Sequence, residues 1–163
     1  MLKSGCNIHC LIISLCIYII SFGIAAFLSR NQTYTIDYKG LGFTDLFFHN
    51  QIQGLTIILY GLLTFGIGNS VLLVINAFNA AGVVVILVYN SYGIRPLLLH
   101  FFPHALFEIS ALIIFTTIVY ILSNILFSLD VDNLLGKIKR LLLVIASLLL
   151  VIAAIIESAV PNI

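Results

Sequence analysis

Charged residues are scarce in this sequence. Of its 163 residues, only 8% are charged, whereas 62% are hydrophobic. An ordinary soluble domain carries roughly 25% charged residues. A soluble fold of this size could not bury so much apolar surface and still present a wettable exterior, so the composition excludes a soluble globular domain. The net charge of +1 gives no indication of a nucleic-acid partner.

Cysteine is also rare, and its pattern excludes two kinds of site. The chain has three cysteines, Cys6, Cys10 and Cys16, at or within the first hydrophobic run. An odd number argues against a closed disulfide framework, and the spacing resembles no zinc ligand set. We interpret all three as small apolar residues of a membrane helix.

What the sequence does contain is long apolar runs. No charged side chain occurs from Leu46 to Ile94 or from Leu141 to Ile156. About 20 apolar residues cross a hydrocarbon core of roughly 30 Å, so the first of these runs is long enough for a helical hairpin. The turn of this hairpin is expected at Gly66, Gly68 and Asn69.

The chain as a whole is predicted to be an all-α membrane protein. It forms one integral membrane domain over residues 1–163, a polytopic bundle of about five transmembrane helices. The first run is longer than the core of a secretory signal and lacks a clear cleavage site, so it counts as a true span. The expected spans are residues 8–28, 46–67, 70–89, 104–129 and 141–160.

The basic residues near the span ends predict the orientation. The side of the membrane that is richer in Lys and Arg is usually the cytoplasm. An inside N-terminus places four basic residues inside and three outside, so the N-terminus of this multi-pass chain is expected in the cytoplasm. The inside set is Lys3, Lys137, Lys139 and Arg140; the outside set is Arg30, Lys39 and Arg95.

Several polar residues lie within the apolar spans, where they are costly. His104 and Glu108 are spaced i, i+4 and therefore share one helix face, directly after Pro103 at a helix start. Glu157 lies near the far end of the last span. The fourth and fifth spans are antiparallel neighbours, so Glu108 and Glu157 are expected at a similar depth.

The start of the second span falls at that same depth. The topology therefore predicts one intramembrane polar cluster toward one leaflet, made of His49, Asn50, His104, Glu108 and Glu157. The favoured interpretation is structural, because carboxyl, imidazole and amide groups hydrogen-bond between helices in lipid. A transport path or a partner contact is one alternative. A metal site of His49, His104, Glu108 and Glu157 is another, although the His-Glu-x-x-His pattern is absent.

The third span carries a second polar pattern. Asn76 and Asn79 occur among small residues that run on to Gly82. Small residues let helices approach closely, and amides hydrogen-bond across them. This stretch is expected to be a helix-packing seam, with a role in lining a polar pathway as the alternative.

Four stretches of the sequence together resemble the stage II sporulation protein M family of bacterial membrane proteins. The resemblance covers about Leu46 to Pro161, and its specific part is the pair of elements Pro-His-x-x-x-Glu and Ile-Glu-x-x-x-Pro. The chain departs from the family pattern at Ala105 and Ser110, where the family often has Gly and Pro. The four stretches are His49-Asn50, Asn76 to Gly82, Pro103 to Ile109 and Ala153 to Pro161.

The resemblance implies a mixed range of functions. Short members of this length occur in gene clusters for circular bacteriocins, and this compact chain is most like them. There the implied partners are the lipid bilayer, a separate ABC ATPase subunit, a second membrane protein and a peptide substrate, with no cofactor. The expected function is thus a non-catalytic membrane subunit of an ABC-type complex for bacteriocin maturation, export or immunity.

Two alternatives stay open from the sequence. Sporulation members of the family are membrane scaffolds that recruit peptidoglycan hydrolases. An intramembrane hydrolase, metal-dependent or acid–base, is the third possibility, with Glu108, Glu157 and the histidines as its groups. The chain has no phosphate-binding Gly-rich loop, so ATP hydrolysis requires another polypeptide.

Overall fold

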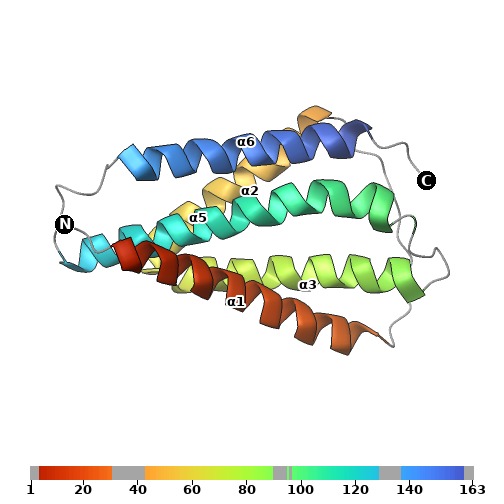
Figure 1. Cartoon of the computed structure of the whole chain (residues 1–163), viewed down its shortest axis with the longest axis horizontal. Helices are drawn as coiled ribbons and strands as arrows, with labels where there is room; N and C mark the ends of the chain where they lie inside the picture. Colours follow the sequence, from red (N-terminus) through yellow and green to blue (C-terminus); the bar gives the residue numbers. More distant parts are fainter. Residues whose placement is uncertain (1–3, 31–42, 90–94, 96, 129–136, 160–163) are drawn as a thin grey trace.

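The protein folds into a bundle of long α-helices that run alongside one another (Figure 1). The computed structural model describes residues 4–30, 43–89, 95, 97–128 and 137–159. Within these residues, five helices are long and apolar enough to cross a bilayer. No described residue belongs to a β-strand. A helix satisfies its own backbone hydrogen bonds, which lipid cannot do for it. The predicted all-α membrane fold of about five helices is confirmed.

The helices alternate in direction along the bundle. α1, α3 and α6 run one way and α2 and α5 the other, so the start of α1 and the end of α6 lie at opposite ends (Figure 1). A short π-helical turn, η1 (Leu97–Phe101), leads directly into α5. The long helices are α1 (Ser4–Ser29), α2 (Phe43–Leu63), α3 (Ile67–Tyr89), α5 (Phe102–Ser128) and α6 (Lys137–Ala159).

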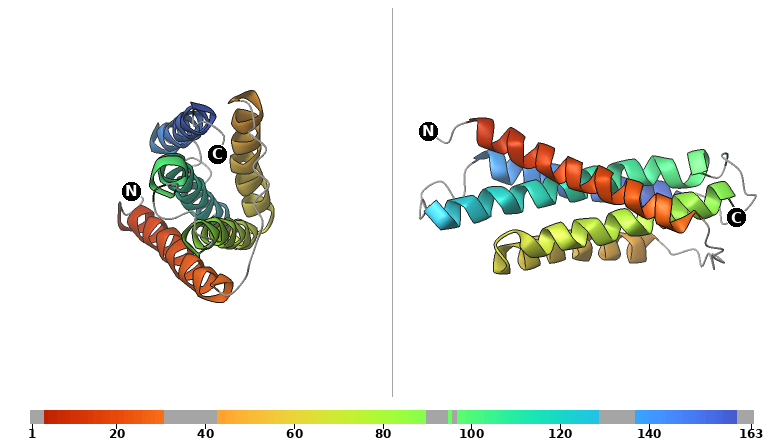
Figure 2. Two further views of the ribbon diagram at one scale, coloured as in Figure 1. Left: turned by 90° about the vertical axis from the view of Figure 1, so that its right-hand side faces the viewer. Right: turned by 90° about the horizontal axis from the view of Figure 1, so that it is seen from below.

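α5 is the central helix of the bundle. It packs against each of the other four long helices, and its span is the most buried of the five. α1 lies against α3, while α2 lies against both α3 and α6 (Figure 2). Leu112 of α5 is fully buried, and it belongs to a core cluster with Ile57 of α2, Leu73 of α3 and Leu150 of α6.

Two glycines bring α2 close to α5. Gly54 and Gly61 are seven residues apart on one face of α2, and both are buried. A Cβ atom at Gly54 would lie 2.7 Å from the Phe115 ring, and one at Gly61 would lie 2.5 Å from Val119. Lipid is as apolar as the helices, so van der Waals contact between closely approaching backbones is what holds such an interface together.

Polar side chains tie α3 to α5 near the hairpin end of the bundle. The Asn69 amide donates to the Thr116 carbonyl at 3.3 Å. The Ser70 and Tyr120 hydroxyls share a hydrogen bond at 2.5 Å. Hydrogen bonds of this kind fix the rotation of one helix against its neighbour, which apolar packing alone specifies weakly.

Two further hydrogen bonds connect other helix pairs. The Thr117 hydroxyl of α5 donates to the Ser14 hydroxyl of α1 at 3.4 Å. The Gln51 amide of α2 donates to the Ser147 carbonyl of α6 at 3.3 Å. Polar contacts are therefore spread around the bundle and are not confined to the predicted cluster.

The α2–α3 hairpin closes through a tight turn. The Gly66 N–H donates to the Gly61 carbonyl at 2.7 Å, the six-to-one bond of a Schellman cap. Phe65 and Gly66 both have positive φ, 51° and 93°. The Thr64 hydroxyl accepts from the Gly68 N–H at 2.7 Å, so the end of α2 is bonded to the first turn of α3.

This turn lies a few residues earlier than expected. The second span was expected to reach residue 67 and the third to begin at residue 70, but α2 ends at Leu63 and α3 begins at Ile67. Phe65 and Gly66 make the turn with positive φ, so Gly66 is a turn residue as expected, whereas Gly68 and Asn69 lie in the first turn of α3. Outside the described residues lie the expected ends of the fourth and fifth spans, residues 129 and 160, together with Lys3, Lys39 and Pro161.

Candidate functional site: an intramembrane polar cluster

The entry of α5 places the acid–imidazole pair. Proline is tolerated in a first helical turn, where its missing N–H has no partner to lose, and Pro103 is the second residue of α5. His104 follows it and is buried, with its ring in edge contact with Phe101 at 5.6 Å between centroids. Glu108, one turn on, is half-buried on the same face.

Glu108 is the point at which several helices meet. Its carboxylate accepts a side-chain hydrogen bond from Asn76 of α3. It also interacts electrostatically with His104 of its own helix, His49 of α2 and Glu157 of α6. Four of the five long helices thus contribute a polar side chain to the surroundings of one carboxyl group.

The fifth helix contributes a tyrosine. Tyr18 of α1 is buried and interacts electrostatically with Glu108. Its hydroxyl has no hydrogen-bond partner among the described residues. Glu108 is therefore within electrostatic range of side chains from every long helix of the bundle.

The predicted cluster members are not equally placed. His49 interacts electrostatically with both glutamates, and Glu108 also interacts with His104 and Glu157. His49 is exposed and His104 is buried, so the group extends from the bundle interior to its surface. Asn50 is only 3% exposed, and its amide nitrogen has no hydrogen-bond partner among the described residues.

Asn76 and Tyr18, which also surround Glu108, could not be predicted from the depth of each residue along its helix. Glu108 is six residues into α5, about 9 Å along its axis, whereas Asn76 is thirteen residues from the end of α3, about 20 Å. The sequence placed Asn76 in a packing seam and gave Tyr18 no role. The signal that was available is chemical: Asn76 is an amide near the middle of an apolar helix, where it needs a partner.

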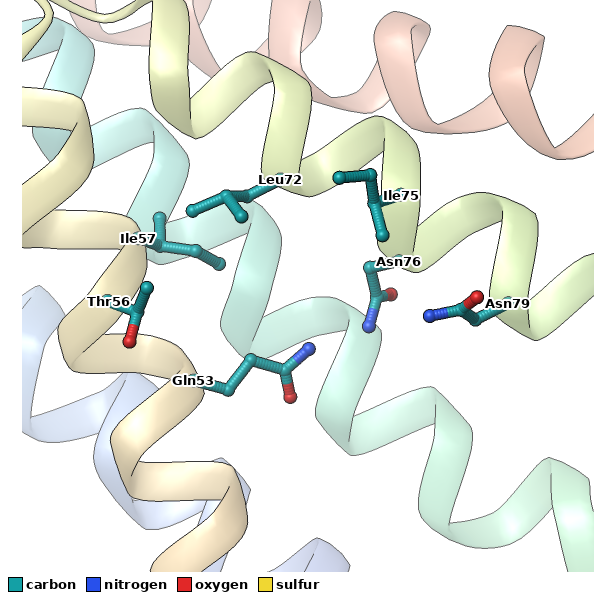
Figure 3. Close-up of a pocket in the computed structure, with 7 residues that line it drawn as sticks. All are labelled: Gln53, Thr56, Ile57, Leu72, Ile75, Asn76 and Asn79. Atoms are coloured by element: carbon teal, nitrogen blue, oxygen red, sulfur yellow. The ribbon is translucent and has the colours of Figure 1, made fainter.

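Only part of the predicted packing seam on α3, which comprises Asn76, Asn79 and Gly82, contacts other residues of the described chain. Asn76 turns inward to Glu108, but Asn79 is exposed, and a Cβ atom at Gly82 would meet nothing within 4 Å. Asn76 and Asn79 both line a cavity of about 150 Å³ between α2 and α3. Gln53 and Thr56 of α2 line it from the opposite side, and the amides point toward one another across it (Figure 3).

The arrangement suits hydrogen bonding and proton sharing more than metal binding. Among the residues that the structure describes, no three His, Cys, Asp or Glu side chains are grouped closely enough to hold a metal ion. A carboxylate with two imidazoles, an amide and a second carboxyl nearby can exchange protons within the group. Each hydrogen bond that joins two helices in lipid contributes about 0.6 kcal/mol on average.

Comparison with known proteins gives one match. The sequence pattern of the family described as stage II sporulation protein M matches residues 10–161. The match therefore includes α1, beyond the resemblance noted from Leu46 onward, and every residue of the polar cluster. No curated protein and no solved structure matches the chain.

Proposed function

The chain belongs to the stage II sporulation protein M family, and from this premise we propose that it is a non-catalytic membrane subunit of an ABC-type complex for bacteriocin maturation, export or immunity. Family membership supports a role as one membrane component among several. The narrower role rests on the likeness of this compact sequence to the short family members that occur in gene clusters for circular bacteriocins.

One observation carries the non-catalytic role. Glu108, the acid of the Pro-His-x-x-x-Glu element, is engaged by Asn76 from a neighbouring helix and by charged or polar groups from the others. A carboxyl group so enclosed holds the helices in register. The cluster thus supports a structural role for both glutamates.

The energy for such a complex comes from another chain. The sequence has no phosphate-binding Gly-rich loop, and the segments that join the long helices are too short for a nucleotide-binding domain. We therefore assign ATP hydrolysis to a separate ABC ATPase subunit and further membrane contacts to a second membrane protein. Lipid surrounds the bundle, and a peptide is the proposed substrate.

The proposed location is the bacterial plasma membrane with the N-terminus in the cytoplasm. In that orientation the starts of α2 and α5 and the end of α6 lie toward the outer leaflet, because these three helix ends share one end of the bundle (Figure 1). Glu108, His49 and Glu157 are then near the outer side. The hairpin turn at Gly66 is near the inner side, where an ATPase docks.

Co-purification tests this role. The chain, tagged at its C-terminus, is expressed with the ATPase and membrane protein encoded beside it, and the membranes are solubilised in mild detergent. We expect all three proteins to elute together, and we expect bacteriocin resistance of the cells to require an ATPase with an intact phosphate-binding lysine. A chain that purifies alone, with no ATPase gene beside it and full resistance without ATP hydrolysis, contradicts the proposal.

A further inference from the structure

A polar groove lies between α2 and α3 on the side away from the core of the bundle. It is the half-open cavity of about 150 Å³ described above, and its polar lining is Gln53 and Thr56 on α2 with Asn76 and Asn79 on α3. In Figure 3 the Gln53 amide points across the groove toward Asn76, and the Asn79 amide points toward Asn76 from one turn further along. Three amides therefore converge on one small space.

This groove opens at the middle of the membrane. Gln53 is near the centre of the span Thr44–Leu63, and Asn79 is near the centre of Ile67–Val88. Ile75 of α3, which lines the groove, is apolar and exposed, as lipid-facing residues are. The exposed Asn79 amide is thus presented toward hydrocarbon and not toward an aqueous surface, whereas the Gln53 amide oxygen is buried within the groove.

Asn76 is engaged by Glu108, but two other amides of the groove, Gln53 and Asn79, have polar groups without a described partner. The Gln53 carbonyl oxygen is buried and unpaired among the described residues. Asn79 is exposed, and no described residue hydrogen-bonds to its side chain. Lipid tails cannot pair with either group, and an unpaired polar group in hydrocarbon is costly. The groove is therefore incomplete within this chain.

The surface next to the groove admits the close approach of a helix. Gly82 lies three residues after Asn79 on the same face of α3, and a Cβ atom there would meet nothing within 4 Å. Small residues at such a position allow a neighbouring helix to approach the backbone. Asn79 and Gly82 together give one polar contact and one close contact on a single helix face.

We propose that this groove binds a transmembrane helix of a second, different polypeptide, which inserts an amide or hydroxyl side chain between α2 and α3. Amides of Gln53 and Asn79 each donate and accept, so they pair with Asn, Gln, Ser or Thr side chains of a partner. The partner is a different chain because a two-fold pair of copies would set the same concave groove against itself and leave it unfilled. The inference goes beyond the ABC-type role, because it names a surface and holds for any membrane partner of that chemistry.

Binding of a defined probe helix tests the proposal. The full chain, labelled on its amino groups with an energy-transfer acceptor, is reconstituted in phosphatidylcholine vesicles. The probes are two donor-labelled leucine-rich single-span peptides that differ only at the central residue, Asn in one and Leu in the other. We expect the Asn peptide to bind the wild-type chain about tenfold more tightly than the Leu peptide.

Three variants locate the binding. Q53L/N79L is expected to bind both peptides equally. G82L fills the open space without a clash inside the chain, and it is expected to weaken the Asn peptide about tenfold with both amides intact. Q51L is the matched control. It removes the Gln51 amide, which is also on α2 but bonds Ser147 and does not line the groove, and it is expected to retain the preference for the Asn peptide.

Three results would each overturn the proposal. The first is equal binding of both peptides by the wild-type chain, and the second is an undiminished preference in Q53L/N79L. The third is self-association of the wild-type chain in the absence of peptide that N79L abolishes, since the occupant would then be a second copy. Thermal unfolding of each variant in the same vesicles establishes that the comparison is made on folded protein.

Discussion

Asn76 donates a side-chain hydrogen bond to Glu108, and so the middle of α3 is joined to the first turns of α5. Three residues further along α3, an identical side chain, Asn79, faces outward without a described partner. One helix therefore carries the same amide in two roles. This pair of asparagines offers a matched comparison for the stability of the bundle.

We expect Asn76→Leu to destabilise the isolated protein and Asn79→Leu to leave its stability unchanged. The first change removes the donor to a half-buried carboxylate, which costs about 1 kcal/mol in the free energy of unfolding for an interhelical hydrogen bond in lipid. The second removes an amide that bonds to nothing described in the chain. Unfolding by dodecyl sulfate in mixed micelles, followed by circular dichroism, measures both. Equal losses for the two variants would contradict the Asn76–Glu108 contact.

The two glutamates are expected to tolerate replacement by glutamine. Glu108→Gln keeps the shape of the side chain and a carbonyl acceptor for Asn76, whereas Glu108→Leu leaves the Asn76 amide unpaired. We expect the glutamine variants at Glu108 and Glu157 to retain assembly and resistance, and Glu108→Leu to lose about 1 kcal/mol of stability. Complexes that assemble with either glutamine variant yet lose all product would instead indicate acid–base catalysis.

The close contact of α2 with α5 is expected to depend on Gly61. In Gly61→Ala the new Cβ atom would meet Val119 at 2.5 Å and the Asn69 Cβ at 2.9 Å, both near the backbone and unable to move away. Overpacking of this kind costs about 1–3 kcal/mol. Gly82→Ala is the control, since the added atom meets open space and alanine is the better helix former by about 1 kcal/mol. A thermal shift in detergent that falls for Gly61→Ala and stays level or rises for Gly82→Ala is the expected result.

Tyr120→Phe is expected to weaken the hairpin end of the bundle. The change removes the hydroxyl that bonds Ser70 at 2.5 Å across the α3–α5 interface and keeps the ring that packs on Gly66. A loss of about 0.6–1.7 kcal/mol is expected in the free energy of unfolding. Ser110→Ala serves as the comparison, because among the described residues that hydroxyl bonds the Leu106 carbonyl of its own helix and no other helix. If the two variants lose the same stability, the Ser70–Tyr120 bond does not hold the interface.

The sequence places the helices well because span length is a one-dimensional property. The scarcity of charge and the positions of Arg30, Asp130 and Arg140 delimit apolar runs of membrane length without reference to neighbours. The hairpin turn was displaced by a few residues because Phe65 adopts a left-handed conformation. Glycine is the usual residue there, so the sequence pointed to the glycines that follow.

The grouping of polar residues was partly accessible in the same way. Alternating helix direction places His49, His104, Glu108 and Glu157 at one end of the bundle, and these four residues do interact. Asn76 and Tyr18 were not predicted there. Depth counted along each helix assumes parallel, level axes, and it fails where helices of different length are displaced along one another.

Scarce charge and long apolar runs by themselves determined that the chain forms membrane-spanning helices and that both glutamates lie within them. Only the tertiary structure decided which amide pairs with Glu108 and which is left facing lipid. Asn76 and Asn79 are chemically identical and three residues apart, so no local pattern separates them. The packing of α2, α3 and α5 around the tight Gly54 and Gly61 contacts separates the two asparagines, because it fixes the rotation of each helix.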